Sequence, residues 1–372
     1  MRVLVNGLSI GSLSGRHVVY GFLRPLAAWT REQHEYVLVT YESESPPRGL
    51  LRENVRRIEV SDRLRPWWKR TPWERLELPK LVKRERIDLV LTASGATVPG
   101  CPAPQVSLAQ NPWCFVSAAQ VGIRSRVKAV LQRRAYRQAL GTAQMMIYLS
   151  HYLEAQYARL AVGGTMPRSE VAYPALDDDT HDSAAAWRAR QEKDPLLIVS
   201  VSAMAPWKRA ETVVSALGQL RAGGVEATLR LVGPWPDWSY RARIERQVEA
   251  THLSDVVQIT GEVSKSELHR HYAEAKVFCL MSACESYGIP AAEAQAFGTP
   301  VVSTRDCAIS EVCEGAGLFG PVDDTEWTTQ ALNTMLSDEK TWQSCSRRAI
   351  QNARALRWDS CARPLMSMFE VA

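Results

Sequence analysis

Short runs of apolar, strand-forming residues alternate along this chain with longer stretches whose apolar positions recur at helical spacing. The expected strands are 2–6, 36–40, 55–60, 87–92, 105–108, 145–149 and 171–173 in the first half, and 196–202, 227–232, 256–260, 276–282 and 301–304 in the second. The expected helices are 18–29, 123–140, one that starts at 151, 209–223, 240–250, 265–275, 325–336 and 339–368. Regular β-α alternation in both halves predicts an α/β protein with two doubly wound, Rossmann-like domains.

The alternation is interrupted between residues 177 and 193, where the chain is polar and carries no strand signal. Pro174 lies three positions before this stretch, which begins with three aspartates, so a domain boundary and a hinge are expected near it. A chain of 372 residues is long enough for two domains of ordinary size. We therefore expect one domain over 1–174 and a second over 175–356.

The stretch 284–300 contains two carboxylates between two expected strands. Its pattern of strand, loop, short helix, glycine and strand is typical of one parallel β-α-β unit, with Pro290 opening the helix and Gly298 following its end. Glu285 is then expected in the loop after a strand, and Glu293 in the first turn of the helix. In open α/β sheets, ligands bind in the crevice outside the carboxyl ends of the strands.

Several loops of the second half are expected at the same edge of its sheet. They are 202–208, 233–234, 261–263, 285–288 and 304–311. Lys208 and the backbone amides of 286–288, which lead into a helix N-terminus, suit a diphosphate, whereas Glu285 and Glu293 suit sugar hydroxyls. A nucleotide-sugar meets all of these demands. The alternative for each residue alone is structural, because a lysine here is often solvated and a glutamate can favour a helix N-terminus.

The first half offers weaker signals. A loop over 7–15 is rich in glycine and serine and could approach a phosphate, but it lacks the G-x-G-x-x-G spacing and is equally compatible with a plain turn. The segment 63–86 carries nine basic and three acidic residues with Trp67, Trp68 and Trp73 among them. This composition is typical of a segment that binds an anionic membrane surface. The alternative is a solvated, partly helical segment whose tryptophans pack on the core. A second basic segment, 123–140, is expected to be a surface helix that packs through Ile123, Val127, Val130 and Leu131, with an anion-facing role as the secondary alternative.

Composition narrows the classes of protein. The net charge of +5 is too small an excess to indicate a nucleic-acid partner by itself. No run approaches about 18 apolar residues, and the N-terminus lacks the features of a signal peptide. The eight cysteines form no Cys-x-x-Cys pair, and no His/Asp/Glu cluster has ligand spacing, so reduced thiols, a cytoplasmic protein and no metal are expected.

The stretch 285–302 (ESYGIPAAEAQAFGTPVV) resembles the signature of family 4 glycosyltransferases, which are retaining, group 1-like enzymes of the GT-B fold. The similarity extends to 201–209, 231–233, 259–263 and 310–312, and more loosely to 110–112 and 148–150 in the first half. It implies two Rossmann-like domains that face a central cleft. It also implies a hexosyltransferase that moves a sugar from a nucleotide-diphosphate sugar to an acceptor, without a cofactor.

The resemblance also implies roles for individual residues. Lys208 would bind the donor diphosphate and, with Glu285, form the catalytic pair, Glu285 contacting the transferred sugar. The remaining donor-binding residues would be Gly15, Gly233, Gly261, Glu262, Val263, Ser286, Tyr287, Gly288 and the ribose-binding Glu293. Acceptor-side candidates are Gln110, Asn111, His17 and Ser150, and a C-terminal helix over about 357–372 would pack back on the first domain.

Two departures from the family pattern stand out. Ala203 occupies a position where the family often has an arginine, and no histidine lies at Gln110–Asn111, which leaves His17 and His151 as the nearest candidates. Retaining transfer in this family is thought not to need a strong enzymic base.

The expected acceptor is a glycan or lipid-linked glycan of a surface polysaccharide, reached in the cytoplasm or on the inner face of the membrane. The alternatives are an inactive GT-B-like binding subunit and a GT-B sugar-nucleotide epimerase.

Overall fold

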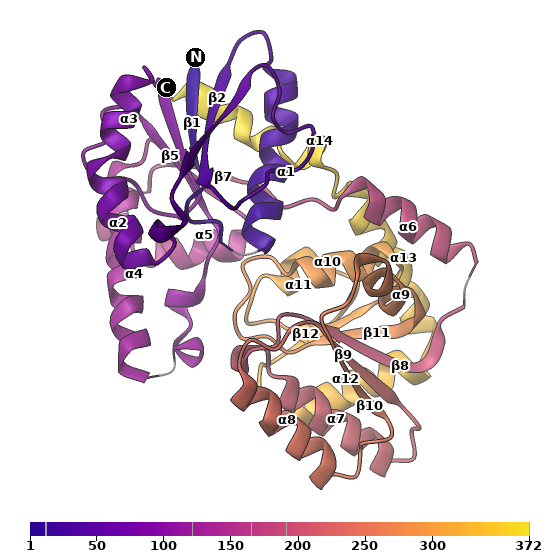
Figure 1. Ribbon diagram of the computed structural model, residues 1–372. Helices are drawn as coiled ribbons and strands as arrows, with labels where there is room; N and C mark the ends of the chain where they lie inside the picture. Colours follow the sequence, from indigo (N-terminus) through magenta and orange to yellow (C-terminus); the bar gives the residue numbers. More distant parts are fainter. Residues whose placement is uncertain (12, 121, 165, 191, 372) are drawn as a thin grey trace. The chain divides into compact units, whose positions relative to one another are not determined.

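The computed structural model describes residues 1–11, 13–120, 122–164, 166–190 and 192–371. The chain forms two compact units, each with its own parallel sheet (Figure 1). The first unit contains Met1–Phe115, Gln120–Ala175 and Trp358–Ala372, and the second contains Val116–Ala119 and Leu176–Arg357. The expected class of two α/β, Rossmann-like units is therefore confirmed.

The sheet of the first unit has the strand order β3-β2-β1-β4-β5-β6-β7, and its strands pair in parallel. Its strands are β1 (Arg2–Asn6), β2 (Glu35–Tyr41), β3 (Val55–Val60), β4 (Leu89–Thr92), β5 (Gln105–Ala109), β6 (Met145–Tyr148) and β7 (Arg168–Val171). Its helices are α1 (Leu13–Trp29), α2 (Trp67–Leu76), α3 (Leu78–Arg84), α4 (Gly122–Thr142), α5 (His151–Ala158) and the terminal α14 (Trp358–Cys361), with the 3₁₀ helix η6 (Arg363–Glu370). The winding direction reverses between β1 and β4, which are neighbours although two strands separate them in the sequence.

The sheet of the second unit has the order β10-β9-β8-β11-β12-β13, again parallel. Its strands are β8 (Asp194–Val201), β9 (Thr228–Val232), β10 (Val257–Gly261), β11 (Ala275–Leu280), β12 (Val301–Thr304) and β13 (Gly317–Gly320). Its helices are α6 (Asp178–Arg188), α7 (Ala210–Ala222), α8 (Trp238–Ala250), α9 (Lys265–Glu274), α10 (Ile289–Ala296), α11 (Ile309–Val312), α12 (Thr325–Ser337) and α13 (Glu339–Ala355). Here the winding reverses between β8 and β11.

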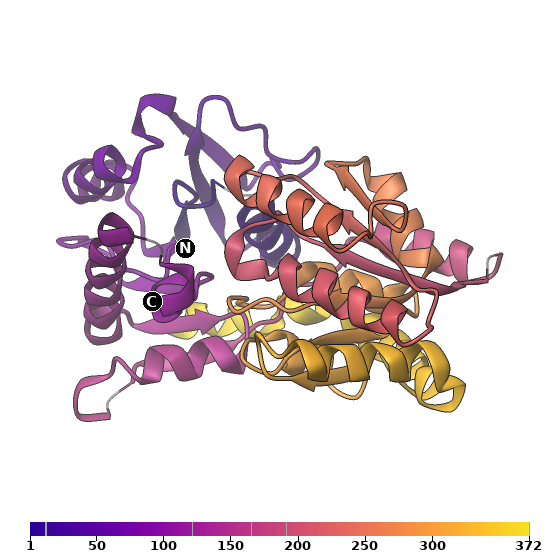
Figure 2. The same cartoon turned by 90° about the horizontal axis from the view of Figure 1, so that it is seen from below.

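Helices cover both faces of the second sheet. One face carries α7, α8 and α12, which lie in a row when the unit is seen from below (Figure 2). The other carries α9, α10 and α13 (Figure 1). Because both faces are covered, β11 and β12 are buried along their whole length, as is typical of central parallel strands.

Some elements differ from those expected. Strand β13 was not predicted, because its four residues, GLFG, include two glycines, which are poor strand formers. Gly317 is nevertheless required there, since a Cβ atom would lie 1.8 Å from the carbonyl oxygen of Val301. The helix expected over 339–368 ends at Ala355, and the last segment is the short α14 followed by η6 rather than one α-helix. Pro364 lacks the N–H that a continuous α-helix needs.

The C-terminal segment is anchored to the first unit by a tryptophan. The Trp358 ring lies 5.3 Å from that of Phe22 and 5.1 Å from that of His17, centroid to centroid. A Cβ atom on Gly21 would lie 2.1 Å from the same indole, so glycine leaves the space that the ring fills. The short α14 therefore packs on α1.

The helix α4 buries a different face from the one predicted. Ala129, Tyr136, Ala139 and Leu140 are buried in it, whereas Ile123, Val127, Val130 and Leu131 are exposed. The two alanines let the helix approach the 3₁₀ turn η2 (Trp113–Phe115), and the Tyr136 ring stacks on that of Tyr157 at 4.6 Å. Aromatic stacking and close backbone approach thus decided the buried face, against the wider apolar stripe.

The tryptophans of 63–86 divide between the two readings given above. Trp73 is partly buried against the core beside Leu78 and Leu81 of α3. Trp67 and Trp68 are exposed on α2.

Candidate functional site

Two expected donor-site residues, Lys208 and Glu285, come from the loops after β8 and β11, the two strands at which the winding of the second sheet reverses. Because the following helices pass to opposite faces at this point, the two loops diverge and leave room for a ligand. Lys208 ends the 3₁₀ helix η5 (Pro206–Lys208) that follows β8, and Glu285 lies in the loop between β11 and α10. The loops are joined by a hydrogen bond of 2.8 Å from the N–H of Ala283 to the carbonyl oxygen of Trp207.

Lys208 and Glu285 contact each other directly. The Nζ atom of Lys208 donates a hydrogen bond to Oε1 of Glu285, and each side chain is only 14% exposed. Because the pair is largely buried, removal of one partner would leave the charge of the other uncompensated. An anionic ligand at Lys208 would therefore compete with Glu285 and release its carboxylate.

Arg209, directly after Lys208, was not predicted as part of this arrangement. It adopts a left-handed conformation, with φ of 54°, and this turn starts α7. Its Nε atom lies 2.6 Å from Oδ1 of Asp323, a residue with φ of 66°. Left-handed residues other than glycine are uncommon, and this ion pair fixes the turn that carries Lys208. No sequence signal could link two residues so far apart in the chain.

The loop that holds Glu285 turns into α10 at Gly288. This glycine is the N-cap residue with φ of 96°, and a Cβ atom would lie 2.6 Å from Cγ1 of Ile309. Glycine is therefore required both for the conformation and for the close approach. The amides of Ser286, Tyr287 and Gly288 lead into the N-terminus of α10, where an anion is favoured.

Glu293 lies in the second turn of α10, not in the first turn as predicted, because the helix begins at Ile289. Its Oε2 atom accepts a hydrogen bond of 2.9 Å from the hydroxyl of Tyr272 in α9. Burial, followed by the nearby Glu293 carboxylate, raises the pKa of the Tyr272 phenol well above its ordinary value, so this phenol is a donor at neutral pH. Sequence reasoning missed Tyr272, which carries no motif.

The loops after β9 and β10 contribute the expected glycines. Gly233, with φ of 126°, donates a hydrogen bond of 2.8 Å from its N–H to the carbonyl oxygen of Gly261. A Cβ atom on Gly233 would lie 2.1 Å from the carbonyl oxygen of Ser202. Glycine at this position therefore lets the loops after β8, β9 and β10 approach one another. Beyond Gly261, Glu262 is exposed and Val263 is half-buried. Their expected roles beside the base stay predictions.

Two first-unit candidates, Gly15 and His17, lie in α1, and Gly15 was expected in the loop before it. The helix begins at Leu13, so Gly15 belongs to its first turn and not to the loop over 7–15. Glycine is tolerated there because the first turn of a helix lacks part of its hydrogen-bond ladder. Two residues on, the Nε2 atom of His17 lies 2.9 Å from the carbonyl oxygen of Ala175, and its ring packs on Trp358. These contacts give His17 a structural part within the first unit.

The other acceptor-side candidates make local hydrogen bonds. Gln110 donates from Nε2 to the carbonyl oxygen of Ala93 at 3.0 Å, and Asn111 accepts at Oδ1 from the N–H of Trp113 at 2.9 Å. Ser150 caps α5 by accepting from the N–H of Leu153 at 3.1 Å. The structure thus places Gln110 and Asn111 just past the carboxyl end of β5, and Ser150 past that of β6.

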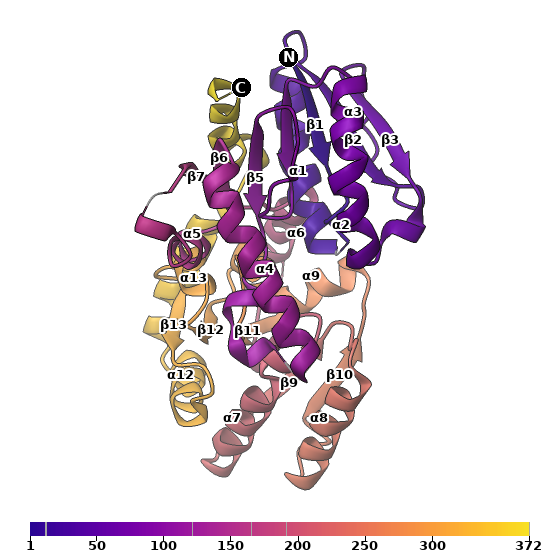
Figure 3. The same ribbon diagram turned by 90° about the vertical axis from the view of Figure 1, so that its left-hand side faces the viewer.

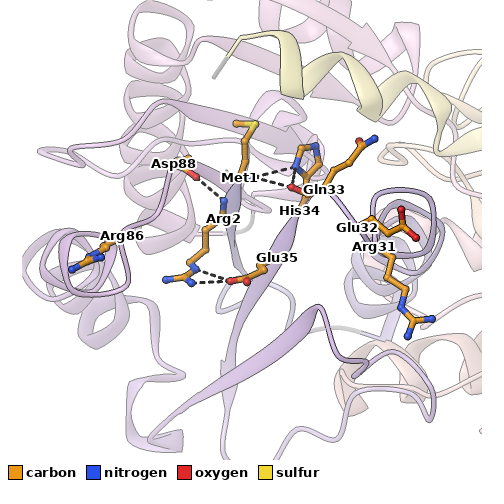
Figure 4. Close-up of a pocket in the computed structure, with 9 residues that line it drawn as sticks. All are labelled: Met1, Arg2, Arg31, Glu32, Gln33, His34, Glu35, Arg86 and Asp88. Atoms are coloured by element: carbon orange, nitrogen blue, oxygen red, sulfur yellow. Dashed lines mark hydrogen bonds and ion pairs between the residues drawn. The ribbon is translucent and has the colours of Figure 1, made fainter.

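A surface pocket lies at the opposite, amino-terminal edge of the first sheet (Figure 4). Three of its charged residues pair with one another: Arg2 pairs with Glu35 at 2.8 Å and donates from its backbone N–H to Asp88 at 2.7 Å. None of the expected site residues lines it.

Among the described residues, no group of three or more His, Cys, Asp or Glu could hold a metal ion. In the same residues, none of the helices is both long and apolar enough to cross a membrane.

Comparison with known proteins connects the second unit to a family. Residues 183–354 match the family of glycosyl transferases group 1. The D-inositol 3-phosphate glycosyltransferase of Kineococcus radiotolerans is 28% identical over 226 residues, which are 57% of this chain and 48% of that protein. The chain spans about half the length of the curated relatives it matches.

Solved structures share the fold over the whole chain. Sucrose-phosphate synthase from Thermosynechococcus elongatus has a TM-score of 0.76 at 18% identity, covering 100% of this chain and 98% of that one. Anabaena Alr3699/HepE, solved in complex with UDP-glucose, has a TM-score of 0.74 at 14% identity and covers both chains completely. At these identities the likeness establishes the GT-B fold alone.

Proposed function

Because residues 183–354 belong to the group 1 glycosyl transferases, we propose that the protein is a retaining glycosyltransferase. It moves a sugar, of the hexosyl type, from a nucleotide-diphosphate sugar to a glycan or lipid-linked glycan in surface polysaccharide biosynthesis. The observation that carries this proposal is the direct contact between Lys208 and Glu285 at the point where the second sheet reverses its winding. At this point a cation can bind a phosphate and a carboxylate can accept hydrogen bonds from sugar hydroxyls, which suits a ligand that carries a phosphate next to a sugar.

The proposed division of labour follows from the chemistry of these groups. The ammonium group of Lys208 and the amides at the start of α10 stabilise the charge that develops on the departing diphosphate. Once the diphosphate takes over Lys208, the carboxylate of Glu285 is released to accept hydrogen bonds from hydroxyls of the transferred sugar. Catalysis then rests on positioning and electrostatics, and the departing phosphate takes the proton of the acceptor.

Glu293 serves the other sugar of the donor. Its Oε1 and Oε2 atoms can accept from ribose hydroxyls, while the Tyr272 hydroxyl holds Oε2 in place. Support for a nucleotide-sugar donor comes from Alr3699/HepE, which was solved with UDP-glucose, with UDP and glucose, and with UDP. Neither a metal nor another cofactor is part of this proposal, since the lysine and the helix N-terminus supply the positive potential.

A donor panel tests the proposal. The protein is incubated with UDP-, GDP-, ADP- and dTDP-sugars in the presence of glycan acceptors, and release of the nucleoside diphosphate is measured. The anomeric configuration of the product, read by NMR, tests retention. Diphosphate binding without release for every donor and acceptor would identify an inactive binding subunit, and consumption of the donor without acceptor would identify an epimerase.

A further inference from the structure

Another pocket, of about 490 Å³, lies at the amino-terminal edge of the second sheet. Lys193 directly precedes β8 and Lys276 is the second residue of β11, so the pocket lies where these two strands begin. The last residues of α6, the residues just after α10 and one side of α13 form the rest of its wall. Figure 3 shows α9 and α13 on one side of the strands of this unit, with α7, α8 and α12 on the other. The loops that carry Lys208 and Glu285 belong to the opposite edge of the same sheet.

The wall of this pocket carries more positive than negative charge. Its basic side chains are Arg188, Lys193 and Lys276, and its carboxylates are Glu192 and Glu339. The Nζ atom of Lys276 lies 2.7 Å from Oε2 of Glu339, whose side chain is 58% exposed, whereas that of Lys276 is 11% exposed. Because water solvates Glu339 well, an anion in the pocket can take its place beside Lys276.

The other two cations are held by neutral acceptors. Lys193 donates from Nζ to two carbonyl oxygens in the last turn of α9, at 3.3 and 3.1 Å, and to the hydroxyl of Thr299 at 2.6 Å. Arg188 donates from Nη1 to the carbonyl oxygen of Ala296 at the end of α10. These contacts fix the two side chains without cancelling their charge, and a guanidinium has further N–H groups for a ligand.

The pKa of Lys193 reports the same excess of positive charge. Burial, and then the nearby charges of Lys276 and Arg188, lower the pKa of this ammonium group to about 7. Each of these three causes disfavours a further positive charge. The potential that produces them favours an anion in the adjacent pocket.

Aromatic rings lie beside the cations. Trp187, Phe297 and Trp342 line the pocket, and Trp187 directly precedes Arg188 at the end of α6. The Nζ atom of Lys276 lies 3.9 Å from the centroid of the Trp342 ring, and Nε1 of Trp342 donates to the carbonyl oxygen of Lys276 at 2.8 Å. A wall in which cations adjoin aromatic rings suits a ligand that joins an anionic group to a ring.

From this arrangement we propose that the pocket at the amino-terminal edge of the second sheet binds a small organic phosphate. The phosphate lies at Lys276 and Arg188, Lys193 adds positive potential, and the ring of the ligand packs against Trp187 and Trp342. The carboxylate of Glu339 turns into solvent when the phosphate arrives. A phosphate suits three cations better than a carboxylate does, because it carries up to about two negative charges near neutral pH. The inference does not depend on sugar transfer.

Calorimetry on the full chain tests this site, with phenyl phosphate as the probe. Lys208→Ala serves as the starting protein, because it lacks the cation that could bind the probe at the donor edge. We expect phenyl phosphate to bind it as tightly as it binds the unchanged protein, and more tightly than inorganic phosphate does. The neutral benzyl alcohol should bind more weakly than either anion.

Two sets of substitutions separate the charged contacts from the ring contact. Adding Arg188→Gln and Lys276→Met should lower the affinity for phenyl phosphate roughly tenfold to a hundredfold, because charge-assisted contacts are lost. Adding Trp187→Ala instead should lower it about twofold to tenfold and leave the affinity for inorganic phosphate unchanged.

Arg246→Gln is the matched control, since Arg246 is exposed on α8, on the other side of the sheet. It should bind phenyl phosphate like the starting protein. Because Lys276 is buried, Arg188→Gln is also tested alone; its side chain is exposed, and the affinity should fall about threefold to tenfold. Equal affinity in Arg188→Gln and Arg246→Gln, or no binding by the starting protein, would overturn the proposal. So would tighter binding of benzyl alcohol than of phenyl phosphate.

Discussion

The ammonium group of Lys208 and the carboxylate of Glu285 are hydrogen-bonded to each other across two loops that follow adjacent strands. Seventy-seven positions separate them in the chain. The pair is mostly buried, so each charge depends on the other while no anion is bound. Because of this dependence, replacing Glu285 and replacing Lys208 should change turnover and diphosphate affinity in different ways.

Replacing Glu285 by alanine should abolish transfer while nucleotide affinity is kept or increased. The variant loses the contacts to the transferred sugar, and Lys208 becomes fully available to a diphosphate. We expect kcat to fall about a hundredfold or more, in line with the loss of one group that stabilises the transition state. Turnover and nucleoside diphosphate affinity, the latter by calorimetry, are measured in parallel. Unchanged turnover would exclude the sugar-contact role.

Replacing Lys208 by alanine should weaken diphosphate binding. A charge-assisted contact in a mostly buried site is worth about 1.5–3 kcal/mol, which corresponds to a loss of roughly tenfold to a hundredfold in affinity. Lys340→Ala is the matched control, since Lys340 is an exposed lysine on α13 of the same unit. Nucleoside monophosphates should distinguish the two variants less than diphosphates do. Equal diphosphate affinity in both variants would rule out the phosphate role.

Replacing Tyr272 by phenylalanine should loosen the ribose contact and leave the diphosphate contact intact. The change deletes only the hydroxyl that donates to Glu293. We expect affinity for a ribonucleoside diphosphate to fall roughly twofold to tenfold, the effect of losing one ordinary hydrogen bond, because the lost hydroxyl acts through Glu293 and does not touch the nucleotide. Its 2′,3′-dideoxy analogue should be affected far less. A parallel loss for both nucleotides would show that Glu293 does not hold the ribose.

Replacing Gly233 by alanine should destabilise the second unit. A Cβ atom there meets the carbonyl oxygen of Ser202 in a backbone conformation that glycine favours, so we expect a loss of about 2 kcal/mol or more. Gly218→Ala in α7 is the control, because its nearest contact would be an ordinary 3.7 Å to Leu253. That change should stabilise the unit by about 0.5–1 kcal/mol. Denaturant unfolding, monitored by tryptophan fluorescence, measures whether the two substitutions change the free energy of unfolding in opposite directions.

Local patterns were enough to place most strands and several helices, because their signals reside in neighbouring residues. The apolar run before Ser282 and the Pro290 and Gly298 signals predicted β11 and α10 to within a few residues. The same reasoning failed at β13, where packing against β12 overrides two glycines. It also misplaced Gly15 and Glu293 by about one turn, because helix starts depend on caps that periodicity does not show.

By itself, the sequence determined that the chain alternates β and α elements in two halves, and that Lys208 and Glu285 follow strands. Those properties depend on side-chain type and spacing. Only the tertiary structure decided which strands are neighbours, and therefore that Lys208 meets Glu285 and that Tyr272 meets Glu293. It also decided which face of α4 is buried, since the fit of Tyr136 against Tyr157 is a property of packed side chains and not of their order along the chain.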